Sequence, residues 1–200
     1  MNPDPIEIDT ADGKVYLAAF PKEHHRDTVF AVLGKAVGRS VSAADLQESE
    51  EHPRPEFPSL GLDANWTHSG DVCVLAYSFE CRVGVDLERF RNRGLGIAKR
   101  FFHADEVAYL ERLLDENSVP GGETVSDVGA DSPAMAAFYD LWCRKEAYFK
   151  CAGGDFFAGT LRTSMLADCV NGVHLKKMNP EMLGIHDRFG FCLATRPNRR

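Results

Sequence analysis

Two pairs of residues bracket one long helix in the second half of the chain. Ser132 and Pro133 are typical of the cap and first turn of a helix, and Gly153 and Gly154 are typical of its end. The interval between them corresponds to about five turns at 3.6 residues per turn. The sequence therefore predicts a helix between these signals, with Glu146 well inside it.

The predicted helix presents a carboxylate and an ammonium group on one face. Glu146 and Lys150 are four residues apart, and residues at this spacing are neighbours on a helix surface. Lys145 lies about 100° around the helix from Glu146, so it is the weaker candidate for the same site. Trp142 shares the face of Glu146 one turn earlier, where core packing is its expected role.

A second acidic cluster ends an apolar segment at residues 84–88, Gly-Val-Asp-Leu-Glu. Side chains alternate between the two faces of a strand, so Asp86 and Glu88 project the same way. Carboxylate oxygens together with phosphate are the ligands that Mg²⁺ prefers. We therefore expect Asp86, Glu88 and Glu146 to form one magnesium site.

Four short motifs follow one another along the chain. They are Asn-Trp-Thr-His-Ser-Gly-Asp at 65–71, Gly-Val-Asp-Leu-Glu at 84–88, Lys-Arg-Phe-Phe at 99–102, and Trp-x-x-Lys-Glu-Ala-x-x-Lys at 142–150. In this order they resemble the motifs of the 4'-phosphopantetheinyl transferases, with the surfactin-synthetase-activating subclass as the nearer match. The resemblance spans roughly residues 51 to 160.

This resemblance implies a reaction, a cofactor and partners. The phosphopantetheine arm of coenzyme A would be transferred to a serine of an apo acyl or peptidyl carrier protein, releasing adenosine 3',5'-bisphosphate. Mg²⁺ would be held by Asp86, Glu88 and Glu146 against the pyrophosphate. Glu146 has a second possible role as the base that removes the serine proton. Lys150, with Lys145 as the second candidate, would pair with the phosphates.

The resemblance also implies further contacts with coenzyme A. His68 falls at a histidine that meets the phosphates in the family, and Thr67 keeps a hydroxyl where the family often has serine. Arg54 aligns with a lysine that meets the 3'-phosphate, and Arg26 resembles part of an amino-terminal His-Arg pair near the nucleotide. Glu106 recurs in the family, and for it helix capping and direct catalysis both stay open.

Hydrophobic periodicity predicts the other elements. Lys14–Phe20 is predicted to be a strand and Arg26–Val37 a helix, followed by an exposed, proline-rich connector over residues 40–60. Asp71–Ser78 and Cys81–Leu87 are predicted to form a hairpin that delivers Asp86 to the end of a sheet. Further helices are predicted at 95–102 and 104–114, and further strands at 161–166, 172–177 and 190–195.

The expected fold is α/β (α+β), with two similar lobes in a pseudo-two-fold arrangement, each a small sheet packed on a long helix. Residues 1–88 would form the first lobe and residues 89–200 the second, with coenzyme A in the cleft between them. Segments 71–76 and 188–194 are faintly alike, which agrees with two related lobes. Residues 115–131 are expected to be a mobile loop, because their composition cannot bury enough surface.

The composition indicates which class of protein this chain belongs to. The chain has 200 residues, 44% of them hydrophobic, and six scattered cysteines that we expect to be reduced. No signal peptide or membrane span is expected, so the protein is predicted to be cytoplasmic, without membrane association, and to act as a monomer. The net charge of −7 argues against nucleic-acid binding.

Basic residues nevertheless crowd just after the Asp-Leu-Glu stretch. They form either a docking site for an acidic carrier protein or an ordinary solvated face. They are Arg89, Arg91, Arg93, Lys99 and Arg100.

Two other functions fit the same residues. A Mg²⁺-dependent phosphohydrolase would use the same three carboxylates and would cleave coenzyme A without a carrier. A transferase-like module without activity would bind carriers but not Mg²⁺ and coenzyme A.

Overall fold

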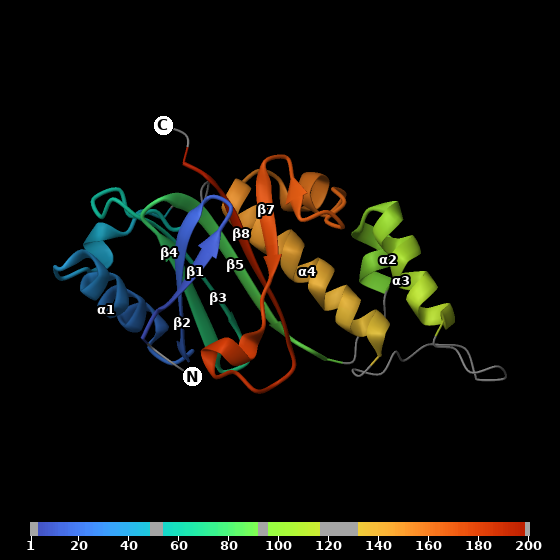
Figure 1. Cartoon of the computed structure of the whole chain (residues 1–200), viewed down its shortest axis with the longest axis horizontal. Coiled ribbons are helices and arrows are strands. Elements are labelled where there is room, and N and C mark those ends of the chain that lie inside the picture. Colours follow the sequence, from blue (N-terminus) through green and yellow to red (C-terminus); the bar gives the residue numbers. More distant parts are fainter. Residues whose placement is uncertain (1–3, 49–53, 92–95, 117–131, 199–200) are drawn as a thin grey trace.

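The computed structural model describes residues 4–48, 54–91, 96–116 and 132–198. They form two four-stranded antiparallel sheets that share one apolar core and are covered by helices (Figure 1). The α+β class and the arrangement of two sheets, each packed against helices, agree with the expectation from the sequence. The division of the chain at residue 88 stays a prediction.

The first sheet has the strand order β1-β2-β4-β3. Its strands are β1 (Ile6–Thr10), β2 (Gly13–Pro21), β3 (Asp63–Ser69) and β4 (Val72–Ser78). The second sheet has the order β5-β8-β7-β6. Its strands are β5 (Cys81–Arg89), β6 (Cys169–Val170), β7 (Val173–Lys177) and β8 (Phe189–Pro197).

Helices cover the outer faces of the two sheets, with α1 at one end of the molecule and the pair α2 and α3 at the other (Figure 1). The predicted helix with Glu146 is α4, which has Ser132 as its N-cap and Gly153 as its C-cap. The α-helices are α1 (His25–Val37), α2 (Gly96–Phe101), α3 (Ala104–Glu116) and α4 (Pro133–Ala152). The short helices are η1 (Ala43–Asp45), the π-helix η2 (Phe156–Thr160) and η3 (Pro180–Leu183).

Successive side chains of a strand point to opposite faces of its sheet, so each strand contributes to two different cores. On β2, Leu17 and Ala19 face the second sheet, whereas Ala18 and Phe20 face α1. β5 sends Val83, Val85 and Leu87 into the core between the sheets. Its opposite face, with Asp86 and Glu88, is consequently turned towards α4 and the end of the sheet.

The two sheets meet along two edge strands that share no ladder of backbone hydrogen bonds. Instead, side chains of β3 reach the backbone of β5. Asp63 Oδ2 accepts from Val83 N at 2.7 Å, Asn65 Oδ1 from Val85 N at 3.2 Å, and Ser69 Oγ from Arg89 N at 3.0 Å. We call this side-chain-to-backbone contact of β3 with β5 the seam.

The predicted hairpin of β4 with β5 is wrong, although both strands exist. β4 pairs with β2 and β3, whereas β5 pairs with β8 in the other sheet. Ser78 Oγ accepts from the amides of Glu80 and Cys81 at 3.0 and 3.1 Å, and donates to Lys14 O at 2.6 Å. These bonds satisfy backbone groups of the turn after β4, so the chain can pass to the second sheet without forming a hairpin with β4.

Two other predictions also differ from the structure. The connector over 40–60 is not exposed throughout, because Phe57 and Leu60 are buried against α1 and the first sheet. Residues 161–166 form no strand, since they follow the π-helix as turns and coil. Most of the predicted mobile loop, 117–131, lies outside the described residues, as does Arg93.

The cysteines agree with the expectation that they are reduced. All six cysteines are free, and five of them are buried, with Cys169 as the exposed one. In the part of the chain that the structure describes, no helix is long and apolar enough to cross a membrane.

Gly84 of β5 lets α4 approach the sheet closely, and its replacement by alanine is expected to destabilise the protein. A Cβ atom there would lie 2.2 Å from Ala147 O and 2.5 Å from Cys151 N, both backbone atoms of α4. Overpacking of this kind costs about 1–3 kcal/mol or more. Urea unfolding would measure the loss. Gly96→Ala is the matched control, because no residue that the structure describes lies within 4 Å of the added Cβ there. Equal stability of the two variants would contradict the prediction.

Candidate functional site

A pocket of about 420 Å³ lies where β3, β5 and α4 meet. It holds all three predicted carboxylates and three of the predicted phosphate contacts. Its lining residues are Trp66, Thr67, His68, Asp86, Glu88, Trp142, Glu146 and Lys150. We call it the carboxylate pocket.

Asp86 and Lys150 form the ion pair at its base. Lys150 Nζ donates to Asp86 Oδ1 at 2.7 Å and to Val85 O at 3.1 Å. Thr67 Oγ1 donates to the same carboxylate oxygen at 2.9 Å. The side chain of Asp86 is 8% exposed and that of Lys150 is 22% exposed, so the pair is partly withdrawn from water but open to a ligand.

Glu88 is oriented by the same strand that orients Asp86. Ser69 Oγ donates to Glu88 Oε2 at 3.0 Å. Ser69 lies two residues after Thr67, so alternate residues of β3 hold alternate residues of β5. The two carboxylates thus project the same way, as the sequence predicts.

Glu146 faces these carboxylates from α4, and the pKa of its carboxyl is raised to about 7. Burial is the largest cause, and the negative charge of Asp86 is the next. Lys150 opposes the shift and Glu88 adds to it. A carboxyl with a pKa near neutrality can accept a proton at physiological pH and release it again.

The donor set fits Mg²⁺ in its chemistry. Three carboxylates line one pocket, and the charges of Asp86 and Glu88 raise the pKa of Glu146. A divalent cation among them would remove this repulsion, and hard oxygen donors are those that Mg²⁺ takes. Within the described ranges, no three His, Cys, Asp or Glu side chains are already gathered closely enough to hold a metal ion. The ammonium of Lys150 neutralises Asp86 instead.

His68 and Thr67 lie beside the ion pair on β3. The His68 ring is exposed at the pocket and stands 5.9 Å from the ring of His25 at the start of α1. Partial desolvation, followed by the charge of Lys22, lowers the pKa of His68. Thr67 is buried, and its hydroxyl also receives a hydrogen bond from Lys150 at 3.2 Å.

A second pocket of about 570 Å³ adjoins the first and shares Trp66 and Lys150 with it. Its other lining residues come from the chain before β3, from β3 and β5, and from the end of α4 and the residues just after it. They are Arg26, Glu48, Arg54, Pro55, Glu56, Asn65, Arg82, Phe149, Gly153 and Gly154. We call it the second pocket.

Arg54 and Arg26 both line the second pocket but already have partners. Arg54 forms two hydrogen bonds with Asp63, and it donates to Lys150 O at 2.7 Å and Val83 O at 2.9 Å. These bonds tie α4 and β5 to β3, which is a different role from the expected contact with the 3'-phosphate. Arg26 pairs with Glu48 at 2.8 Å and is largely exposed.

The structure does not bring Lys145 to either pocket. Its side chain is fully buried, and Nζ contacts Glu106 Oε2 at 2.8 Å. Nζ also donates to Leu161 O at 2.9 Å and Thr163 O at 2.7 Å. Lys145 thus points away from Glu146, as their 100° separation allows.

Glu106 is the partner in this buried pair and caps α3. Its carboxylate accepts from His103 N at 3.0 Å and from Met165 N at 2.8 Å. These contacts show capping at the start of α3, one of the two roles left open for this residue. Trp142 lines the carboxylate pocket and also stacks on Phe102 and Phe138, each with a centroid distance of 6.2 Å.

Sequence reasoning missed Ser69, Arg82 and the aromatic wall formed by Trp66 and Phe149. The signal for Ser69 was present, because it follows Thr67 by two residues as Glu88 follows Asp86. Arg82 lies on the same face of β5 by the same rule. No comparable signal exists for Phe149, whose position depends on the packing of α4 on β5 and β8.

Comparison with known proteins identifies the relatives of this chain. The family model of the 4'-phosphopantetheinyl transferase superfamily matches residues 82–189, more than half of the chain. The chain is 30% identical over 140 residues to 4'-phosphopantetheinyl transferase ffp of Bacillus subtilis, covering 65% of this chain and 54% of the relative.

Two further relatives show the range of sequence identity among the matches. The chain is 33% identical over 109 residues to 4'-phosphopantetheinyl transferase psf-1 of Bacillus pumilus, covering 53% of this chain and 39% of that one. It is 25% identical over 142 residues to the L-aminoadipate-semialdehyde dehydrogenase-phosphopantetheinyl transferase of Mus musculus, covering 64% and 43%. The matched region thus spans about half or less of the length of these relatives.

Proposed function

Since the chain belongs to the 4'-phosphopantetheinyl transferase superfamily, we propose that it transfers the phosphopantetheine arm of coenzyme A to a serine of an apo acyl or peptidyl carrier protein. The observation that carries the proposal is the carboxylate pocket. Asp86 and Glu88 of β5 line it together with Glu146 and Lys150 of α4, although the strand and the helix are separate in sequence.

The reaction is a displacement at phosphorus. The serine oxygen forms a bond to the phosphorus that carries the pantetheine arm, and the bond from that phosphorus to the bridging oxygen breaks. The bridging oxygen leaves with adenosine 3',5'-bisphosphate. The serine proton passes to Glu146, a carboxyl that lines the same pocket.

Lys150 supplies positive charge to the pyrophosphate. Its ammonium lies 2.7 Å from Asp86 and reaches both pockets, so it can pair with an incoming phosphate while it stays near the carboxylate. His68 lies at the rim and offers a further contact to phosphate. Thr67 holds Asp86 and Lys150 in position.

Asp86, Glu88 and Glu146 would hold Mg²⁺. When bound, the ion neutralises pyrophosphate charge and polarises the bond that breaks. The protein's own part is to fix the two carboxylates of β5 through Thr67 and Ser69.

The test is the intact mass of an apo carrier protein after incubation with this protein, coenzyme A and Mg²⁺. The carrier is expected to gain one phosphopantetheine arm, and the Glu146→Gln variant is expected to leave it unchanged. Unmodified carriers of several types, with coenzyme A intact, would favour a carrier-binding module instead. Coenzyme A cleaved without a carrier would favour a phosphohydrolase.

The proposed carrier partner is acidic, and the basic residues after β5 would receive it. Lys99 and Arg100 stand exposed on α2, and Arg89 is exposed at the end of β5. We expect the KM for the carrier to rise with ionic strength, because salt screens such attraction. A KM for coenzyme A measured in parallel is the control, and a carrier KM that is independent of salt would remove this docking surface. One chain holds the whole pocket, so a cytoplasmic monomer would suffice.

Metal-free protein is expected to lose stability as the pH rises from about 5 to about 7. The pKa of Glu146 is about 7 in the folded protein against an ordinary 4.5. Across this window the folded carboxyl keeps a proton that the unfolded one has lost, so the folded state binds more protons and the free energy of unfolding falls with pH. One proton contributes at most about 1.4 kcal/mol per pH unit, and partial exposure reduces this.

Urea unfolding in a chelator between pH 5 and 8 measures the effect. Glu146→Gln lacks the titrating group, so the stability difference between variant and wild type isolates it. Adding Mg²⁺ at pH 8 is expected to raise the wild-type melting temperature more than that of the variant. A stability difference that does not change with pH would contradict the assignment.

A further inference from the structure

Two arginines stand directly opposite each other where β5 begins. Arg82 on β5 pairs in register with Arg196 on β8, and residues opposite each other on antiparallel strands share one face. Like charges at such positions destabilise a sheet. Burial, followed by the charges of Arg54 and Arg196, lowers the pKa of Arg82. The positive charge concentrated at the start of β5 therefore lowers the stability of the fold.

The carboxylate near this cluster is already used. Asp63 is bound by Arg54 through two hydrogen bonds. Arg82 and Arg196 form no ion pair within the described residues, and the buried Nε atom of each lacks a hydrogen-bond partner there. Since buried polar groups are nearly always hydrogen-bonded, an unpartnered Nε on each of two facing arginines is unusual.

Arg82 lines the second pocket. It is the basic residue of that pocket that forms no ion pair with a described residue. Arg26 pairs with Glu48, Arg54 with Asp63 and Lys150 with Asp86. For Arg82, the described part of the chain provides no such partner. Arg82 also shares the face of β5 with Asp86, four residues or about 13 Å away along the strand.

We propose that Arg82, which lines the second pocket, and Arg196, opposite it on β8, form an anion site that binds a phosphate monoester. A guanidinium presents parallel N–H donors that match two phosphate oxygens. The phosphate has two possible sources. One is the 3'-phosphate of a nucleotide whose other phosphates lie at Lys150. If that nucleotide is coenzyme A, this assignment rests on the proposed function. The other source is inorganic phosphate.

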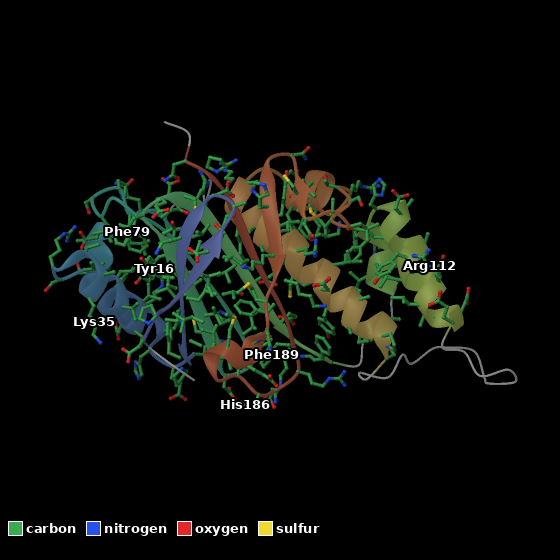
Figure 2. The ribbon with its side chains drawn as sticks, in the orientation of Figure 1. Tyr16, Lys35, Phe79, Arg112, His186 and Phe189 are labelled. Atoms are coloured by element: carbon green, nitrogen blue, oxygen red, sulfur yellow. The ribbon has the colours of Figure 1, made fainter. Side chains whose placement is uncertain are left out.

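Calorimetric titration of the full chain tests the site with three probes: adenosine 3',5'-bisphosphate, adenosine 5'-monophosphate and inorganic phosphate. Arg82→Gln and Arg196→Gln are expected to weaken the bisphosphate by about ten- to a hundredfold each, as for hydrogen bonds to charged groups, and to leave the monophosphate unchanged. Arg112→Gln is the matched control, because Arg112 is exposed on α3 at the far end of the molecule (Figure 2).

The probes separate the two sources. Tighter binding of the bisphosphate than of the monophosphate, lost in Arg82→Gln, assigns the site to a nucleotide 3'-phosphate. Binding of inorganic phosphate that depends on Arg82, with the two nucleotides bound equally, supports the anion site with free phosphate as its ligand. Wild-type affinity of both variants for all three probes would overturn the proposal.

Melting temperatures without any anion give a second readout. Removal of one of two facing charges is expected to raise the melting temperature of Arg82→Gln above that of wild type, while the stabilisation by the bisphosphate shrinks. A lower melting temperature together with unchanged binding would mean that the pair serves the fold, and the proposal would fail.

The transfer assay keeps this proposal separate from the proposed function. Binding that depends on Arg82 in a protein that transfers nothing would leave the anion site standing and remove the transferase. Transfer by wild type, with an unchanged KM for coenzyme A in Arg82→Gln, would keep the transferase and remove coenzyme A from the site.

Discussion

Glu146→Gln is expected to lower the rate of carrier modification by about 10²- to 10⁴-fold, the range that a positioned general base contributes. Glutamine keeps the size of the side chain but cannot accept the serine proton. It also removes one of the three carboxylates of the pocket. The measurement is the initial rate of the carrier's mass gain at saturating coenzyme A, so that weaker binding is not counted as slower chemistry.

The control for this variant is Glu181→Gln, a change of the same kind at an exposed position of η3. It is expected to retain the wild-type rate. Far-UV circular dichroism of both variants would verify the fold. A Glu146→Gln protein within threefold of wild type would exclude Glu146 as the base and leave Asp86 or Glu88 as the carboxylate to test.

Breaking the buried pair of Lys145 with Glu106 is expected to have the largest effect on stability. Both side chains are fully buried and lie 2.8 Å apart. Removal of one partner leaves the other charge buried without compensation, which costs about 3–5 kcal/mol. Lys145→Met and Glu106→Gln should each lower the urea midpoint strongly. The pair joins α3, α4 and the chain at Leu161–Met165, so these segments should loosen together.

The double variant Lys145→Met with Glu106→Leu distinguishes a structural role of this buried ion pair from a role of Lys145 in binding coenzyme A. With both charges gone, much of the stability should return, because a buried ion pair can be replaced by apolar groups at little cost. Coenzyme A affinity of the double variant should then match wild type. A stable variant that has lost coenzyme A affinity would instead restore the role in phosphate binding that the family resemblance implies for Lys145.

The sequence predicted the parts of the site that depend on local periodicity. A period of two places Asp86 and Glu88 on one face of β5, and four-residue spacing places Lys150 beside Glu146. The caps at Ser132 and Gly153 defined α4 within one residue at each end. These features need no knowledge of what lies across the pocket.

The rest depended on contacts between segments that are distant in sequence. Nothing local shows that Lys145 meets Glu106 rather than a phosphate, since both are acceptable partners for an ammonium. The partners of Arg54 are likewise set by α4 and β5, nearly 100 and 30 residues away. β5 belongs to the second sheet because it pairs with β8, which begins about 100 residues after β5 ends.

The seam also gives β5 two classes of amide protons. Alternate amides are held by the backbone of β8, whereas those of Val83, Val85 and Arg89 are held by side chains of β3. Side-chain acceptors can be withdrawn by rotation about single bonds while the sheet stays intact. In hydrogen–deuterium exchange, these three positions would therefore record the separation of the two sheets, while their neighbours on the same strand record global unfolding.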